Sequence, residues 1–194
     1  MTSAMTATQA SLDKLLTTFI EQCQEKLGKF PSIEHDSQWP SPVEMDSVKE
    51  GELTRWQPHR VEESLTFANV EDALEETIHP SIKEYFSFAY SENIEAMSED
   101  GQLSLLFAWN FEDFERLQQN IIGHVLMKRR LRQPISIFFA ITDEDDINLV
   151  VDNEDGSVWV EPVGLKGSKK LADSLSEFLD SLTILVPDSD TQTE

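Results

Sequence analysis

The acidic side chains of residues 141–160 are the first candidates for chemistry, because carboxylates crowded beside a glycine can hold a calcium ion. The segment reads ITDEDDINLVVDNEDGSVWV and contains no Lys or Arg. Its acids are Asp143, Glu144, Asp145, Asp146, Asp152, Glu154 and Asp155. If Gly156 took the sixth place of a twelve-residue calcium loop, the first ligand would be Val151 and the last Pro162. Neither residue has a carboxylate, so we expect no calcium loop.

The histidines and the single cysteine form no recognisable metal or catalytic pattern. His35, His59 and His79 stand in different segments, and no HExxH, CxxC or GxSxG spacing includes His124. Cys23 lies on an apolar helical stripe, where a cysteine usually behaves as a small buried hydrophobe. We therefore expect no metal, no cofactor and no enzymatic activity, and we interpret His124 as a core or boundary residue.

A turn interpretation explains where the acids of 141–160 lie. The runs at 135–141, 147–151 and 157–161 are rich in β-branched and aromatic residues, which favours strands. Asp155-Gly156 between two of the runs suits a tight hairpin turn. Strands joined by acidic turns are therefore expected, although turns alone leave the excess of acids unexplained.

The net charge excludes more classes of function than any sequence motif does. The 194 residues include 37 Asp and Glu but 15 Lys and Arg, for a net charge of −22. Such a surface repels nucleic acid and anionic lipid and attracts basic partners. One cysteine permits no internal disulfide, and we find neither a secretory signal nor an apolar stretch of about 18 residues. We expect a soluble, cytoplasmic, monomeric protein that does not bind nucleic acid, with one domain at 1–186 and a disordered acidic tail at 187–194.

Apolar periodicity defines the expected elements. Helices are predicted at 9–27, 70–78, 82–89, 111–131 and 169–182. Asn69, Asn110 and Ser168 are the expected N-caps of three of them. Further strands are predicted at 52–56, 64–67, 94–97 and 103–108. This order predicts an α+β fold, a mostly antiparallel sheet with helices packed largely on one face.

The distribution of charge on the helices indicates a docking surface. Glu71 with Glu75 and Asp72 with Glu76 are like charges at i, i+4, which disfavour an isolated helix, and no lysine on that face neutralises them. Seven of the fifteen basic residues are instead gathered at 128–132 and 166–170. Solvation alone also explains an acidic face. Segregation of the two signs favours a surface that binds a positively charged partner.

Three stretches of the chain resemble a known family. They are VEDALEETIHPSIKEYF (70–86), LSLLFAWNFEDFERLQQNIIGHVLMKRRLRQPISIFFA (103–140) and the short Trp56-Gln57-Pro58. They closely resemble the Syd family, the SecY-interacting proteins of Gram-negative bacteria, and the likeness runs from about 53 to 182. The resemblance implies a fold related to the SUKH superfamily and a non-enzymatic, peripheral protein on the cytoplasmic side of the inner membrane. It also implies an electronegative concave surface that binds cytosolic loops of SecY and monitors whether the SecYEG complex is assembled.

Charge and resemblance together predict the binding residues. Cytosolic loops of membrane proteins are enriched in Lys and Arg, so an anionic protein repelled by the bilayer can reach the membrane through them alone. The predicted partner-binding residues are Glu71, Asp72, Glu75, Glu76, Glu112, Asp113 and Glu115. The turn acids at 143–146 are expected to assist. An immunity protein or nucleic-acid mimic that blocks a basic nuclease toxin is the alternative, and an acid-base hydrolase is a third.

Overall fold

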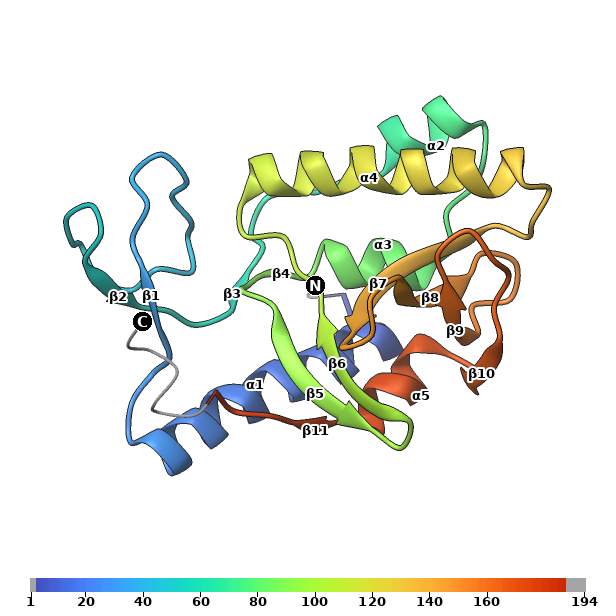
Figure 1. Ribbon diagram of the computed structural model, residues 1–194. Coiled ribbons are helices and arrows are strands. Elements are labelled where there is room, and N and C mark those ends of the chain that lie inside the picture. Colours follow the sequence, from blue (N-terminus) through green and yellow to red (C-terminus); the bar gives the residue numbers. More distant parts are fainter. Residues whose placement is uncertain (1–2, 188–194) are drawn as a thin grey trace.

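The computed structural model describes residues 3–187, and the centre of this part of the chain is a seven-stranded antiparallel sheet (Figure 1). Its strands lie in the order β10-β9-β8-β7-β6-β5-β11. Their bounds are β5 Ile94–Ser98, β6 Gly101–Leu105, β7 Ser136–Thr142, β8 Ile147–Asp152, β9 Val158–Pro162, β10 Lys169–Ala172 and β11 Thr183–Ile184. The predicted α+β fold with a mostly antiparallel sheet is confirmed. The predicted tail lies outside the described residues from 188 onward.

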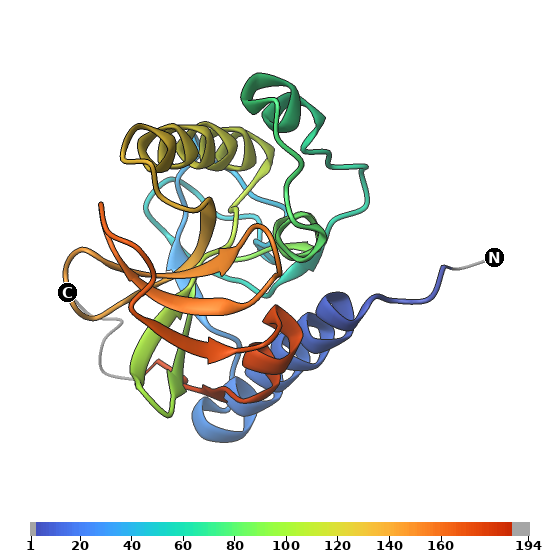
Figure 2. The ribbon, with the colours of Figure 1, turned by 90° about the vertical axis from the view of Figure 1, so that its right-hand side faces the viewer.

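The sheet is curled, as the two views in Figures 1 and 2 show. β10 forms one edge of the sheet, and the β5–β6 turn lies near the other edge. Lys169 of β10 nevertheless forms an ion pair with Asp100 in that turn. The curl therefore brings the two sides of the sheet together at one end.

Side chains alternate between the two faces of a strand, so β7 shows which helices cover each face. The helices are α1 Ala7–Leu27, α2 Ala68–Leu74, α3 Pro80–Phe86, α4 Phe111–Arg130 and α5 Leu175–Asp180. Phe139 contacts Tyr85 of α3 and Phe178 of α5, with ring centroids 5.8 and 5.7 Å apart. Phe138 contacts His124 of α4 at 5.4 Å. Because α1 packs on α3 and α5, three helices share one face, while α4 crosses the other with α2 alongside it.

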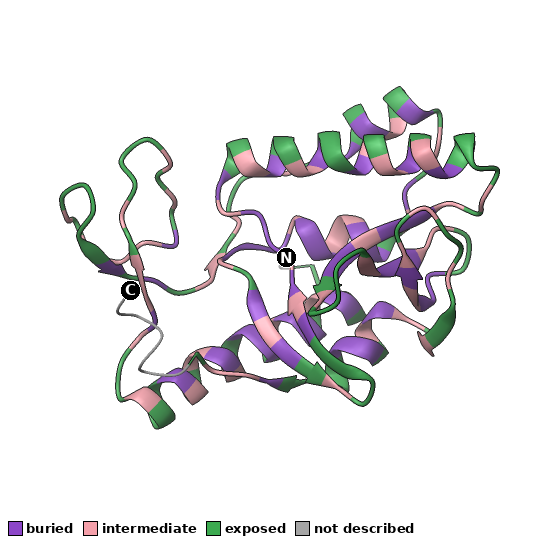
Figure 3. Ribbon diagram, in the orientation of Figure 1, coloured by how far each residue is buried: buried purple, intermediate pink, exposed green. Residues whose placement is uncertain are grey.

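Burial follows this arrangement, and Figure 3 shows buried residues concentrated where α1, α3 and α5 meet the sheet. The outer side of α4 is exposed. Cys23 on the buried stripe of α1 has no exposed surface, and burial raises the pKa of its thiol to about 11. Its predicted role as a small hydrophobe is confirmed.

Residues 31–66 form an ordered segment with short strands. β1 Ser32–Glu34 pairs with β2 Leu53–Arg55, and β3 His59–Arg60 pairs with β4 Ala89–Tyr90. In Figure 1 this segment projects beyond the N-terminal end of α4. It forms one wall of the site described below.

The prediction that Asn69 caps a helix is wrong. α2 begins at Ala68, and Phe67 occupies the N-cap position. The ring of Phe67 packs edge-on against Phe114 of α4, with centroids 5.5 Å apart. The Asn69 side chain donates to Gln118 Oε1 at 3.0 Å. A tertiary contact thus replaces the local cap. The prediction of a strand at 64–67 is also wrong, because these residues form a connection into α2.

The prediction that Ser168 caps the final helix is also wrong. Residues 169–172 form β10, and α5 begins at Leu175 with Ser174 as its N-cap. The Ser174 hydroxyl accepts from the backbone N–H of Glu177 at 3.2 Å. Two lysines at a helix N-terminus oppose the helix dipole, but on an edge strand they discourage unwanted pairing.

Six of the seven acids of 141–160 lie in turns, as predicted, and Asp152 is the last residue of β8. Gly156 has φ = 78° in the β8–β9 hairpin, where the Asp152 carboxylate accepts from the backbone N–H groups of Glu154 and Asp155. The Asp155 carboxylate accepts from the N–H and hydroxyl of Ser157, which lowers the pKa of Asp155. Part of the local excess of acids therefore satisfies turn backbone.

Candidate functional site: an acidic pocket beside the start of helix α4

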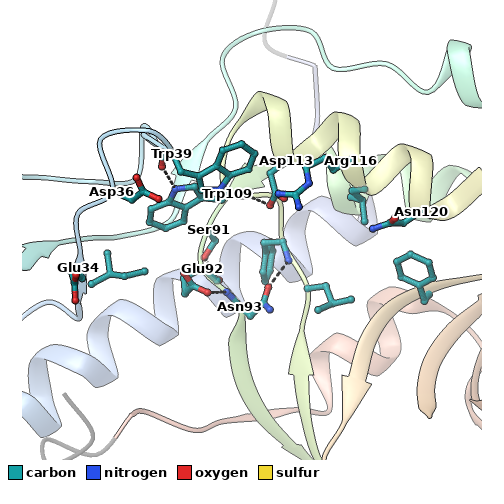
Figure 4. Close-up of a pocket in the computed structure, with 15 residues that line it drawn as sticks. Glu34, Asp36, Trp39, Ser91, Glu92, Asn93, Trp109, Asp113, Arg116 and Asn120 are labelled. Atoms are coloured by element: carbon teal, nitrogen blue, oxygen red, sulfur yellow. Dashed lines mark hydrogen bonds between the residues drawn. The ribbon is translucent and has the colours of Figure 1, made fainter. Parts of the chain in front are cut away.

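A pocket of about 480 Å³ opens beside the N-terminal end of α4 (Figure 4). One wall is formed by β1 and the loop that follows it, and the opposite wall by the first turns of α4. The β4–β5 and β6–α4 connections close the space between them, and Phe138 of β7 lies at one side. Segments far apart in the sequence therefore meet at this point.

Hydrogen bonds at the start of α4 hold the two walls together. Asn110 caps the helix, as predicted, by accepting from the N–H of Asp113 at 2.8 Å. Asp113 accepts in return from the N–H of Trp109 at 2.9 Å. The Asn110 amide donates to Pro40 O at 2.8 Å, and the Trp109 indole donates to Trp39 O at 2.9 Å. The 39–41 loop is thus fixed against the helix.

Four carboxylates face this pocket: Glu34, Asp36, Glu92 and Asp113. None of them has a Lys, Arg or His nitrogen within 4.0 Å among residues 3–187. Burial raises the pKa of Glu92, and the neighbouring charge of Asp113 adds to that rise. Arg116 also lines the pocket, so four acidic side chains and one basic side chain face it; the lining is net negative, and no ion pair joins these residues.

Aromatic side chains supply the remaining recognition surface. Trp39 and Trp109 both line the pocket, and the Arg116 guanidinium lies over the Trp39 ring, 5.2 Å from its centroid. Arg116 shows that the indole of Trp39 can accept a cation on its face. Carboxylates beside indoles form an environment suited to lysine or arginine side chains of a partner.

A second, smaller concavity lies beside the first and reaches the C-terminal end of the described chain. A second pocket of about 210 Å³ shares Ile33, Glu92 and Asn93 with the first. It adds the carboxylate of Glu95 and ends at Pro187. Because three residues line both pockets, the two pockets are adjacent, and together we call them the acidic groove.

The seven predicted partner-binding residues fall into two groups. Asp113 lines the pocket, and Glu112 and Glu115 are exposed beside it on the first turns of α4. The other four belong to α2 and the residues just after it: Glu71, Asp72, Glu75 and Glu76. The pocket faces Asp113 and Arg116, whereas α2 packs along the side of α4 that carries Phe114 and Gln118. The two groups therefore do not line one hollow.

Two of the α2 carboxylates are neutralised, contrary to expectation. Lys83 of α3 lies 3.0 Å from Glu71, and Arg129 of α4 lies 3.2 Å from Glu76. The compensating cations come from other helices, so the spacing within one helix could not reveal them. Asp72 and Glu75 remain exposed. Partner binding by these four residues stays a prediction.

The turn acids at 143–146 lie away from the pocket. All four are exposed, and Asp143 and Glu144 border a different concavity near the β5–β6 turn. Asp146 adopts φ = 65°, which allows the tight β7–β8 connection. Their expected contribution to binding stays a prediction.

Glu34, Asp36 and Glu92 were not predicted as site residues. They lie outside the regular helices on which charge spacing can be interpreted. One signal did point to their neighbourhood, because Trp39 in a proline-rich stretch is too apolar to be left in a flexible linker. Their common location depends on the tertiary contacts of α4 with the 39–41 loop.

A buried charged cluster lies on the opposite half of α4. Lys128 Nζ is 3.0 Å from Glu161 Oε1 and donates to Leu165 O at 2.9 Å. The Ser136 hydroxyl donates to the Glu161 carboxylate at 2.7 Å. Burial lowers the pKa of the adjacent His124, while Glu161 opposes that shift. The interpretation of His124 as a core or boundary residue is confirmed, because its side chain is largely buried.

Neither a metal centre nor a membrane span is apparent between residues 3 and 187. No three His, Cys, Asp or Glu side chains in this part of the chain are grouped to hold a metal ion. Likewise, none of its helices is long and apolar enough to cross a bilayer.

Comparison with known proteins gives a consistent result. Residues 9–183 match the family model described as Syd protein (SUKH-2), a longer match than the likeness at 53–182. The chain is 49% identical to Protein Syd of Colwellia psychrerythraea, covering 92% of this chain and 96% of that protein. It is 46% identical to Protein Syd of Alteromonas mediterranea, with 91% and 96% covered. For Protein Syd of Pseudoalteromonas atlantica the identity is 45%, with 92% and 97% covered.

Proposed function

Because the chain belongs to the Syd family, we propose that it is a non-enzymatic protein that binds basic cytosolic loops of the SecY translocon. The acidic pocket beside α4 is the proposed docking site. Binding would bring the protein to the cytoplasmic side of the inner membrane and could report on the assembly of SecYEG.

The observation that carries the proposal is the unpaired charge of the groove. Glu34, Asp36, Glu92 and Asp113 converge on one concavity that also presents Trp39. Cytosolic loops of membrane proteins are rich in Lys and Arg, so the charges are complementary. Exposed charges mainly accelerate association and select the partner, and salt weakens their effect.

The test compares two double charge reversals of equal size. Glu34→Lys/Asp36→Lys changes the pocket, and Asp72→Lys/Glu75→Lys changes exposed, unpaired acids of the α2 region. Binding to SecYEG proteoliposomes is measured by co-sedimentation, with empty liposomes of the same lipids as the blank. The pocket variant is expected to bind about tenfold more weakly, equivalent to about 1.4 kcal/mol, and the α2 variant like the wild type.

Other outcomes reject the proposal in distinguishable ways. A loss confined to the α2 variant would move the docking surface to α2. Unchanged binding by both variants would exclude electrostatic docking through either group. Retention of a basic nuclease from the soluble fraction, with no binding to SecYEG, would favour the immunity-protein alternative.

A further inference from the structure

The second surface of unusual charge lies at the opposite end of α4. In residues 126–135 and 163–170 there is no Asp or Glu, although 37 of the 194 residues of the chain are acidic. Seven Lys and Arg residues lie in these two segments. Two segments free of acids are therefore unexpected in this chain and call for a separate explanation.

Two hydrogen bonds join these segments into one surface. Lys128 of α4 donates to Leu165 O at 2.9 Å, and the Gln133 amide donates to Gly164 O at 2.8 Å. The end of α4 is thereby fixed to the β9–β10 loop. Figure 2 views this end of the molecule, with the C-terminal end of α4 near the β9–β10 loop. We call the surface the basic end and define it by Arg130, Leu131, Arg132, Val163, Leu165 and Lys166.

Several cations near this surface are already neutralised. Lys128, Arg129, Lys169 and Lys170 pair with Glu161, Glu76, Asp100 and Asp173, respectively. Arg130, Arg132 and Lys166 are exposed, and within residues 3–187 no carboxylate forms an ion pair with them. Asp152 lines the same small concavity as Lys166, but its carboxylate accepts from turn backbone. Three cations are thus free to contact an anion.

Aliphatic side chains project beside the free cations. Leu131, Val163 and Leu165 are 46%, 46% and 58% exposed. Leu131 and Arg132 stand at the end of α4, while the other aliphatic residues are at the tip of the β9–β10 loop. Cations interleaved with protruding aliphatic residues match the interface of a membrane, where phosphates lie above acyl chains.

Helix stabilisation does not account for the whole surface. Cations in the last turn of α4 favour its dipole, which explains Arg130. Arg132 lies beyond the helix with φ = 56°, a left-handed position that usually holds glycine. Lys166 comes from a different segment. Arg132 is thus a cation at a strained backbone position, and Lys166 is a second cation supplied by the facing loop. Stabilisation of α4 explains neither residue, which indicates a role outside the helix.

We propose that the basic end binds the anionic lipid surface of the membrane directly. The net charge of −22 predicts repulsion from such a surface, but screening limits that effect. The Debye length is about 10 Å at 0.1 M salt, so the bilayer senses mainly the cations in contact with it. A nucleic acid would use the same cations and gain nothing from the exposed leucines, which favours lipid as the occupant.

The acidic pocket and the basic end lie at opposite ends of α4. From Asp113 to Arg130 the helix rises about 26 Å, at about 1.5 Å per residue. Lipid binding at one end therefore leaves the pocket free. The inference is independent of the proposed function, and its test uses vesicles that contain no SecY.

Co-sedimentation of the full chain with vesicles tests the inference. Vesicles of phosphatidylethanolamine and phosphatidylglycerol are compared with vesicles of phosphatidylcholine alone. We expect binding to the anionic vesicles only. Arg130→Glu/Lys166→Glu should weaken it by at least about 25-fold, since each cation near such a surface contributes roughly fivefold. The matched control, Lys14→Glu/Lys29→Glu, makes the same change at exposed residues of α1 and the residue after its C-cap and should bind like the wild type.

Two more measurements separate lipid from other anions. Leu131→Ser/Leu165→Ser keeps every charge and should also weaken vesicle binding, whereas a phosphate or nucleic-acid site would be unaffected. Binding should be strongest near about 0.1 M salt and weaker at about 0.01 M, where a Debye length of about 30 Å exposes the bilayer to the whole negative charge.

Arg132→Gly removes one cation at a position that favours glycine, so its weaker binding cannot be attributed to misfolding. No vesicle binding, equal loss in the control, or binding to RNA alone would overturn the inference.

Discussion

Removal of one partner from the buried pair of Lys128 and Glu161 should destabilise the protein strongly. The two residues are 0% and 3% exposed, and Nζ and Oε1 are 3.0 Å apart. Lys128→Met removes the only ammonium paired with Glu161 in the described chain and leaves the carboxylate with Ser136 and His124. An uncompensated buried charge costs about 3–5 kcal/mol. At about 2–4 °C per kcal/mol for a chain of this size, Tm should fall by about 6–20 °C.

A double-mutant cycle by urea denaturation measures the coupling of the pair. Glu161→Gln should destabilise by a similar amount, because it leaves the Lys128 ammonium buried. Lys128→Met/Glu161→Gln should recover much of the loss, since neither charge remains. If each single variant changed the free energy of unfolding by less than about 0.5 kcal/mol, or if the effects were simply additive, the pair would not be a coupled buried interaction.

Two further predictions concern single side chains. In urea denaturation, Gly156→Ala should lower the free energy of unfolding more than Gly164→Ala does. Both glycines have φ near 80°, but only a Cβ at Gly156 would lie 2.5 Å from the His79 ring. Equal losses of stability in the two variants would refute the steric reasoning. Burial lowers the pKa of His124, so its contribution to stability is present above pH 6.5 and is lost as pH falls toward the folded-state pKa. A hydrogen bond to Glu44 raises the pKa of His35, whose contribution is present below pH 6.5 and is lost as pH rises. The pH dependence of unfolding in His124→Gln and His35→Gln should therefore deviate from wild type in opposite directions, and a shared direction would contradict these assignments.

The sequence correctly predicted the elements that are determined by interactions between neighbouring residues. Asn110 has an acceptor side chain before a long apolar stripe with acids first and bases last, and α4 forms there. Asp155-Gly156 lies between two β-branched runs, and a hairpin results. In both cases the residues that determine the structure are neighbours in the chain.

Where tertiary contacts determine the structure, the sequence patterns were misinterpreted or gave no indication. Leu171, Leu175 and Phe178 fit a helical spacing, yet Leu171 belongs to β10, which pairs antiparallel with β9 across the loop at 163–168. Asn69 has the chemistry of a helix cap, but Gln118 of another helix takes its side chain. Periodicity within a segment carries no information about such partners.

The binding site shows the same limit. Asp113 could be selected because helix-start acids are visible in the sequence. Glu34 ends β1 and Glu92 lies in the β4–β5 connection, 58 residues later in the sequence; they share a pocket because both segments lie beside α4. The predicted α2 acids were chosen because no cation lay on their own helix, and Lys83 and Arg129 were supplied from outside it.

Hydrogen exchange on the protein with and without SecYEG tests the central claim most directly. If the acidic groove is the docking site, SecYEG should slow exchange in residues 33–39 and 91–93 and at the start of α4, while residues 68–76 exchange unchanged. Protection of 68–76, with no change at 33–39 or 91–93, would contradict docking in the groove.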